Sequence, residues 1–213
     1  MRQPCVTHLG LRYNALDAPR RLRLGRRPAG RQLRPCGLRR SRIGQLWVII
    51  GEKTLCWGAG TDGQLGNGEL VDSPNPVEVV GLPGPATTIT AGRRHSCAIV
   101  QGDAYCWGTD LDGQLGIDDL GGVHPPTQVQ GLAPGSVTAV SAGHRFTCAI
   151  SNGLPFCWGA NDAGQLGSGS NAPSGLPIPV QGLPPGTAAT AVDAGEDHAC
   201  VLLDDGRAFC WGH

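Results

Sequence analysis

Short apolar runs of about five or six residues recur along the chain, each bounded by glycine, proline or polar turn residues. Residues 95–100 and 104–108 are two such runs joined by a tight turn, and a β-branched run, 86–90, precedes them. Pro-bounded extended segments follow at 76–80, 126–130 and 179–181. Runs of this length without a helical period predict β-strands. The pattern therefore predicts about four short strands in each structural unit.

Four sequence motifs repeat in one shared register. Cys-Trp-Gly begins at Cys56, Cys106, Cys157 and Cys210, with spacings of 50, 51 and 53 residues. Gly-Gln-Leu-Gly follows the first three, Ala-Gly precedes each later hairpin, and a Gly-Leu pair lies between them. A period of this length with four strands is typical of a propeller blade. The residues predicted to be structural are Trp57, Trp107, Trp158, Trp211, Gly63, Gln64, Leu65, Gly66, Gly113, Gln114, Leu115, Gly116, Gly164, Gln165, Leu166 and Gly167.

The sequence thus predicts an all-β fold, a partial β-propeller of about three to four four-stranded blades of ~51 residues. Three complete periods do not close a ring, so we expect an open arc or a fragment. Its exposed strand edges predict self-association. The predicted repeat domain is 44–213, with hairpins around 47–57, 95–107, 146–158 and 198–211.

The cysteines define the expected register of three hairpins. Cys97 faces Cys106 if the turn is centred on residues 101–102. The same geometry pairs Cys148 with Cys157 and Cys200 with Cys210, around turns at 152–153 and 204–206. Residues 152–153 are Asn-Gly, the preferred two-residue turn because both positions need positive φ.

Directly opposed strand residues lie within disulfide reach, so these six cysteines are disulfide candidates, and small buried thiols are the alternative. Three disulfides would indicate an extracytoplasmic or secreted location, whereas thiols would leave a cytoplasmic one open. Cys56 has Trp47 at its expected partner position. Residues 48–50 are predicted as the first hairpin strand and 51–54 as its turn.

Charge divides the chain although the formal net charge is zero. Residues 1–50 contain twelve Arg and one acid, whereas residues 51–213 contain five basic and sixteen acidic residues. Residues 1–43 share nothing with the repeat, and we interpret them as a disordered or mistranslated segment. A basic arm for nucleic acid or an anionic surface is the alternative. No apolar stretch is long enough for a membrane helix, and no secretory signal is recognisable.

The motifs resemble the regulator-of-chromosome-condensation repeat family. The resemblance is carried by Gly-x-x-His at 92–95, aromatic-Cys-Trp-Gly at 105–108 and 156–159, and Gly-Gln-Leu-Gly at 113–116 and 164–167. It covers about residues 52–213 and implies a seven-bladed propeller of which this chain supplies part. The cysteine-bearing version is similar to secreted or surface-attached bacterial relatives. Guanine-nucleotide exchange on a small GTPase is the activity of the family's founding member.

Candidate chemistry in the repeats is sparse. His95 with Cys97 and Cys106 supplies zinc-type ligands, as does His198 with its cysteines, but Phe146 replaces the histidine in the repeat between them. Asp110 and Asp112 resemble the start of a calcium loop without its later bidentate acid. The tryptophans could form a ligand ring, but packing between blades is the simpler interpretation. No catalytic motif is present, so we expect no enzyme activity, metal or cofactor.

The sequence therefore predicts a non-catalytic protein-interaction module. We expect recognition by the loops that vary most between repeats, 67–75, 116–124 and 168–176. The acidic repeat region suggests a basic partner. Nucleotide exchange on a GTPase is the first alternative. Nucleic-acid binding by the Arg-rich arm is the second, which we consider less favoured.

Overall fold

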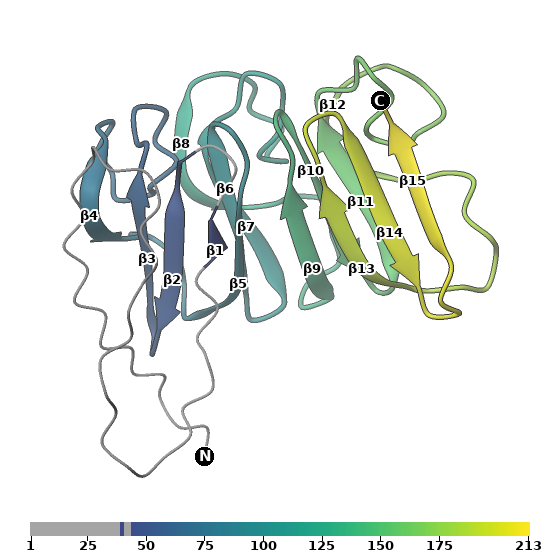
Figure 1. Ribbon diagram of the computed structural model, residues 1–213, viewed down its shortest axis with the longest axis horizontal. Helices are drawn as coiled ribbons and strands as arrows, with labels where there is room; N and C mark the ends of the chain where they lie inside the picture. Colours follow the sequence, from purple (N-terminus) through teal and green to yellow (C-terminus); the bar gives the residue numbers. More distant parts are fainter. Residues whose placement is uncertain (1–38, 41–43) are drawn as a thin grey trace, which may run out of the picture.

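The computed structural model describes residues 39–40 and 44–213, and the described residues form fifteen β-strands in four antiparallel sheets (Figure 1). The strands are β1 (Arg39–Arg40), β2 (Leu46–Ile50), β3 (Lys53–Gly58), β4 (Ser73–Glu78), β5 (Ala86–Ala91), β6 (His95–Val100), β7 (Asp103–Thr109), β8 (Val123–Gln128), β9 (Val137–Ala142), β10 (Phe146–Ser151), β11 (Leu154–Gly159), β12 (Ser174–Pro179), β13 (Ala189–Ala194), β14 (His198–Leu203) and β15 (Ala208–Gly212). None of these residues forms a helix long and apolar enough to cross a membrane. The all-β prediction is confirmed.

Each sheet is one propeller blade. The first blade is β1–β4, the second β5–β8 and the third β9–β12, and in each the strands pair in chain order. The fourth blade contains β13, β14 and β15. Figure 1 shows the blades side by side in a row whose two ends do not meet. The predicted open arc is therefore confirmed.

The apolar core lies between blades rather than inside any one of them. The interface of the second and third blades buries Ile99 and Leu115 against Val140, Ala149 and Trp158. Similar clusters join the first blade to the second and the third blade to the fourth. A single blade cannot cover its own faces, so each blade depends on its neighbour for burial.

The hairpins have the register that the cysteines predict. Cys97 lies opposite Cys106 and Cys148 opposite Cys157. The two-residue turns have positive φ at both positions, 53° and 85° at residues 101–102 and 51° and 75° at residues 152–153. Positive φ at both central positions is typical of the type I′ turn, whose twist matches that of the flanking strands. In the fourth blade the three-residue loop 204–206 is present, with Gly206 at φ 86°.

Two sequence predictions about strand limits are wrong. The first hairpin turn contains two residues rather than 51–54, because Ile50 already pairs with Lys53. The outer strands start three to five residues before the predicted segments, as β8 does at Val123. Their prolines lie within the strands, where an outer position leaves the missing N–H without a sheet partner. A bulge between Cys106 and Gly108 shifts the pairing of β8.

Strand β1 lies within the Arg-rich segment of the sequence, where it pairs with β2. The rest of that segment, residues 1–38 and 41–43, lies outside the described residues, and with it the predictions of a disordered tail or a nucleic-acid arm.

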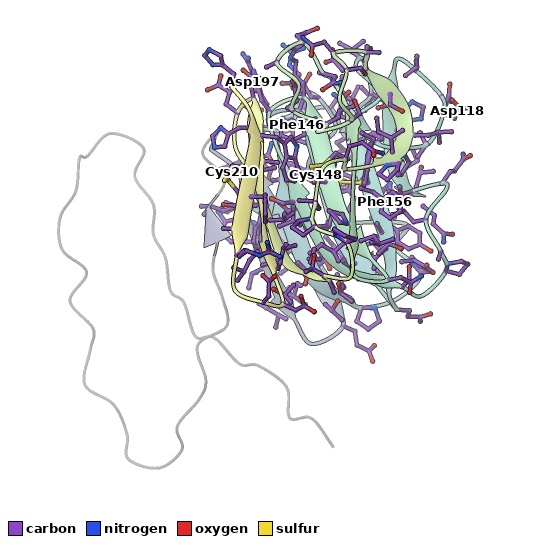
Figure 2. All side chains as sticks on the ribbon, turned by 90° about the vertical axis from the view of Figure 1, so that its right-hand side faces the viewer. Asp118, Phe146, Cys148, Phe156, Asp197 and Cys210 are labelled. Carbon is purple, nitrogen blue, oxygen red and sulfur yellow. A yellow bond between two sulfur atoms is a disulfide. The ribbon has the colours of Figure 1, made fainter. Side chains whose placement is uncertain are left out.

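The two ends of the blades differ in their connections. We call one end the loop face: it carries the dipeptides 93–94, 144–145 and 196–197 and the long loops that follow β3, β7 and β11. In Figure 1 it is the upper end, toward which the arrow of β15 points. Figure 2 places Asp197 and Asp118 at this same end, on opposite sides of the arc. The opposite end, which we call the turn end, carries the tight hairpin turns.

Candidate functional site

Each Gly-Gln-Leu-Gly loop holds a tryptophan of the next blade. The indole N–H donates to the backbone carbonyl of the loop glutamine, which satisfies a buried polar group that would otherwise lack an acceptor. The pairs are Trp107 with Gln64 at 3.0 Å, Trp158 with Gln114 at 3.0 Å and Trp211 with Gln165 at 2.8 Å.

The other loop residues explain why the motif repeats. The Gln114 side-chain oxygen accepts the Asp112 backbone N–H at 2.8 Å, and Leu115 is fully buried between blades. Gly116 has φ 74°, and a Cβ there would lie 2.8 Å from Trp158 Nε1. Only glycine meets both demands. These loops therefore have an architectural role.

His95 is buried in the same interface. Its Nε2 lies 2.8 Å from Thr147 Oγ1, and that hydroxyl donates to the Gln114 carbonyl at 2.8 Å. The hydroxyl must then accept from His95 Nε2–H, because its single proton is already used. Burial, and to a lesser extent the electrostatic influence of His144, lowers the pKa of His95 to about 3. His95 is therefore a neutral packing residue that bridges two blades.

The three predicted cysteine pairs are joined as disulfides, each with a Cα–Cα distance of 4.1 Å. The bonds between Cys97 and Cys106 and between Cys148 and Cys157 are fully buried. They also occupy the thiolates that a zinc site at His95 would need. Cys56, opposite Trp47, is a buried free thiol whose pKa burial raises to about 12. Such a thiol is not a nucleophile at neutral pH.

The two aspartates of the calcium hypothesis lie in different environments. Asp110 is buried, and its Oδ1 accepts the Leu115 backbone N–H at 2.8 Å. Asp110 Oδ2 has no hydrogen-bond partner among the described residues, and burial raises the pKa of this carboxyl. Asp112 instead lies at the loop face beside Arg145. The pair does not converge on a shared ligand position.

A pocket of about 190 Å³ opens on the loop face between the second and third blades. Its lining includes three arginines and a histidine, Arg93, Arg94, Arg145 and His144, and one acid, Asp112. Arg145 binds Asp112 of the second blade at 3.1 Å, across the blade boundary, and Asp162 of its own blade at 2.7 Å. None of the predicted recognition loops lines this pocket. The repeat register places the dipeptides that follow each Ala-Gly at equivalent positions of adjacent blades, but it does not indicate that their side chains line a pocket.

A second hollow of about 490 Å³ lies beside β15, between Trp211 and the third-blade loop at 164–171. Strand β15 pairs only with β14 among the described residues. Self-association through such an edge remains a prediction.

The predicted recognition loops themselves present apolar side chains at the loop face. Leu70 and Val123 both flank Gly63, although they belong to neighbouring blades. Leu120 lies against Gly175 in the same way one blade further along. Leu120 is 67% exposed and Leu111, beside the pocket, is 62% exposed. The predicted recognition loops therefore expose a set of apolar side chains at the loop face.

Comparison with known proteins agrees with the propeller-blade fold described above. The family model for the regulator of chromosome condensation (RCC1) repeat matches residues 53–99, 101–150 and 152–202. The ultraviolet-B receptor UVR8 of Arabidopsis thaliana is 30% identical over 169 residues, which are 78% of this chain and 38% of that protein. The regulator of chromosome condensation of Drosophila melanogaster is 30% identical over 170 residues, 78% of this chain and 30% of that protein.

Among solved structures, human WBSCR16 superimposes with a TM-score of 0.71 at 23% identity, covering 80% of this chain and 45% of that one. The chain thus spans less than half the length of each of these proteins. Each matched stretch begins at the third strand of one blade and ends at the second strand of the next, so the sequence repeat is offset from the blade by two strands. Together the three stretches cover most of the described residues. The chain belongs to the regulator of chromosome condensation (RCC1) repeat family.

Proposed function

We propose that this chain is a non-catalytic protein-interaction module that binds a protein partner across its loop face. The supporting observation is the distribution of exposed large apolar side chains. Eight occur among the described residues, and five of them lie at the loop face: Leu70, Val71, Leu111, Leu120 and Val123. Exposed apolar clusters beside polar groups are typical of interaction sites, and a rigid scaffold with loops at one end suits recognition.

Affinity purification with quantitative mass spectrometry tests this proposal. The baits are the full oxidised chain, the variant Leu70→Ser/Leu120→Ser at the loop face, and the control Leu154→Ser/Leu202→Ser. The control removes two exposed leucines near the turn end. We expect at least one protein to be retained by the full chain and the control and lost by the loop-face variant. If every retained protein binds all three baits equally, the loop face is not the binding surface.

Nucleotide exchange is the alternative function suggested by the family. Fold similarity does not carry activity, and the chain spans less than half of its matched relatives. Nucleotide release from candidate small GTPases, measured with and without this chain, separates the two functions. Accelerated release would replace the interaction proposal, and unchanged rates would leave it in place.

We also propose an extracytoplasmic location, in line with a cysteine-bearing bacterial form of the repeat. The support is that six cysteines form three disulfides, a number that is rare in reducing compartments. Free-thiol counting on denatured, unreduced material from the native source tests this location. Reaction of all six hairpin cysteines would contradict it.

A further inference from the structure

The basic residues of the repeat region are concentrated in one place. Residues 51–213 contain five Lys or Arg against sixteen Asp or Glu. Three of those five, Arg93, Arg94 and Arg145, line the pocket between the second and third blades. The equivalent dipeptide of the fourth blade is acidic, Glu196-Asp197. The pocket is therefore a local cationic site on an otherwise acidic domain.

The three guanidinium groups are not equivalent. Arg145 contacts two aspartates, and Arg94 Nε lies 3.7 Å from Asp62 Oδ2. Within the described part of the chain, Arg93 has no carboxylate within ion-pair distance, and its one hydrogen bond joins Nη1 to His144 Nε2 at 2.8 Å. Arg93 thus carries the positive charge of the pocket that no carboxylate of the described residues neutralises.

The contact with His144 also orients Arg93. A guanidinium can only donate, so His144 Nε2 must be the acceptor and the ring proton lies on Nδ1. That nitrogen faces Glu196 Oε1 at 3.9 Å. His144 is only 17% exposed, so its position is defined by packing as well as by these contacts. The contact with His144 therefore fixes the orientation of the Arg93 guanidinium and of its remaining N–H donors.

The size of the pocket limits what it can hold. About 190 Å³ is below the ~300–1,000 Å³ of pockets for drug-sized ligands. It suits a single side chain of a partner. The exposed side chain of Leu111 forms an apolar part of its rim. Asp112, the one acid in the lining, is already bound by Arg145.

We propose that this pocket binds an aspartate or glutamate side chain of the protein partner, with its carboxylate on Arg93 and an adjacent apolar side chain on Leu111. This inference rests on the proposed interaction function and names the chemistry of the partner at one site. Arginine guanidinium groups bind carboxylates through charge-assisted, often paired hydrogen bonds. The sequence-based expectation of a basic partner follows from total charge and does not apply at this pocket.

A nucleic-acid phosphate has the same charge but fits less well. A nucleic-acid strand carries a dense row of charges, whereas the surface around the pocket includes Asp62, Asp112, Asp162 and Glu196. These carboxylates would repel the successive phosphates of a strand. A single carboxylate on a protein partner avoids most of this repulsion. Nucleic-acid binding is therefore an outcome to be tested against the proposal.

Selection from a phage-displayed library of random linear peptides tests the proposal with the full oxidised chain as bait. We expect enriched peptides to share an Asp or Glu next to a large apolar residue. A synthetic copy of the strongest binder is then measured by fluorescence anisotropy. Arg93→Gln should weaken its binding about tenfold, and replacing the peptide acid by its amide should weaken binding by a similar factor. Arg93→Gln combined with the amide peptide should lower the affinity little more than either change alone.

Arg207→Gln is the matched control, because it removes the same charge at the turn end, where Arg207 pairs with Asp205. It should leave peptide binding unchanged. Arg93 is exposed, and circular dichroism will show whether Arg93→Gln keeps the native fold. Enriched peptides without an acid, or equal effects of the two arginine variants, overturn the inference while the interaction function stands. If no peptide is enriched, the inference fails, and the affinity purification described above decides separately whether the interaction function stands. A single-stranded DNA oligonucleotide is measured in the same way. If it binds more tightly than the peptide and Arg93→Gln weakens its binding, the ligand of the pocket is a phosphate rather than a carboxylate.

Discussion

The tryptophan contacts between blades and the loop face use equivalent positions of the same repeat, but only the tryptophan contacts keep the residue type. Gln114 and Trp158 have identical counterparts in the neighbouring interfaces, each with the same hydrogen bond. On the loop face, by contrast, Arg93, His144 and Glu196 occupy one repeat position and differ in charge. A buried indole needs a fixed acceptor and a close-fitting space, whereas an exposed side chain has neither requirement. Folding therefore constrains these tryptophan contacts and leaves the loop face free to vary.

The largest effect is expected from Trp158→Ala. The side chain is fully buried and its indole donates to the Gln114 carbonyl. Large-to-small core substitution of an aromatic costs about 3–5 kcal/mol of unfolding free energy. Urea unfolding followed by circular dichroism measures the loss. Because the substitution also weakens the coupling between the second and third blades, the transition should broaden.

Trp57→Ala is the control for that measurement. Trp57 occupies the equivalent position of the first blade, is only partly buried, and has no such bond among the described residues. Its replacement should cost clearly less. Equal losses in the two variants would contradict the view that the Gly-Gln-Leu-Gly loops stabilise the arc through the next blade's tryptophan.

The second prediction concerns the disulfide of the third blade. Cys148→Ala/Cys157→Ala removes a cross-link closing a loop of sequence separation 9. The expected loss is about 2–3 kcal/mol on the chain-entropy model. The first blade offers the contrast, since Cys56 has no cysteine partner among the described residues and Cys56→Ala removes no cross-link. A reductant should lower the urea midpoint of the wild-type chain and leave that of the double variant less affected.

The hairpins could be predicted from sequence, whereas the pocket could not. Antiparallel pairing has a strict period of two, so a cysteine spacing of nine and an Asn-Gly turn leave one register for residues 148–157. The predicted segment 126–130 misses the first residues of β8 because it treats Pro126 as a boundary, although an outer strand accepts a proline. The pocket depends on side chains about fifty residues apart, Arg93 and His144, and on the orientations they take. That information arises only when neighbouring blades pack.

The third prediction concerns the pH dependence of the unfolding free energy, which should depend on the residue at the position of His95. His95 has a pKa of about 3 when folded against an ordinary value of 6.5, so between these values the unfolded chain binds the extra proton. Stability must then fall as the pH drops from 6.5 toward 3. At pH 5 the loss from this group is about 2 kcal/mol.

Phe146 occupies the same position in the third blade and is fully buried, so His95→Phe is the natural test. The unfolding free energy of this variant should depend less on pH between 6.5 and 4 than that of the wild type. His198→Phe, at an exposed equivalent position, is the control for the histidine-to-phenylalanine change itself. Parallel curves for the wild type and His95→Phe would show that His95 is not the buried neutral group described above.

The smallest effect, and the one opposite in sign, is expected from Asp110→Asn. Asn161 occupies the equivalent position of the next blade: its Oδ1 accepts the Leu166 N–H at 2.9 Å and its Nδ2 donates to the carbonyls of Ser170 and Ala172 at 2.8 Å. Asp110 makes the first of these bonds but leaves Oδ2 buried without a partner among the described residues. An amide would remove the buried charge and can supply the missing donor, so we expect about 1 kcal/mol of stabilisation at pH 7.

The pH dependence of the stabilisation by Asp110→Asn tests whether the buried carboxylate charge is its cause. Burial raises the folded-state pKa of Asp110 above its ordinary value of 3.8, so above pH 3.8 the folded chain binds more protons than the unfolded one. The wild type therefore loses stability from this group as the pH rises through that range. The advantage of Asp110→Asn should be largest at neutral pH and shrink toward pH 3.8, and Asn161→Asp should show the reverse. Stabilisation that is equal at both pH values would mean that the carboxylate charge is not its cause, and that the second and third blades differ at this position for packing reasons alone.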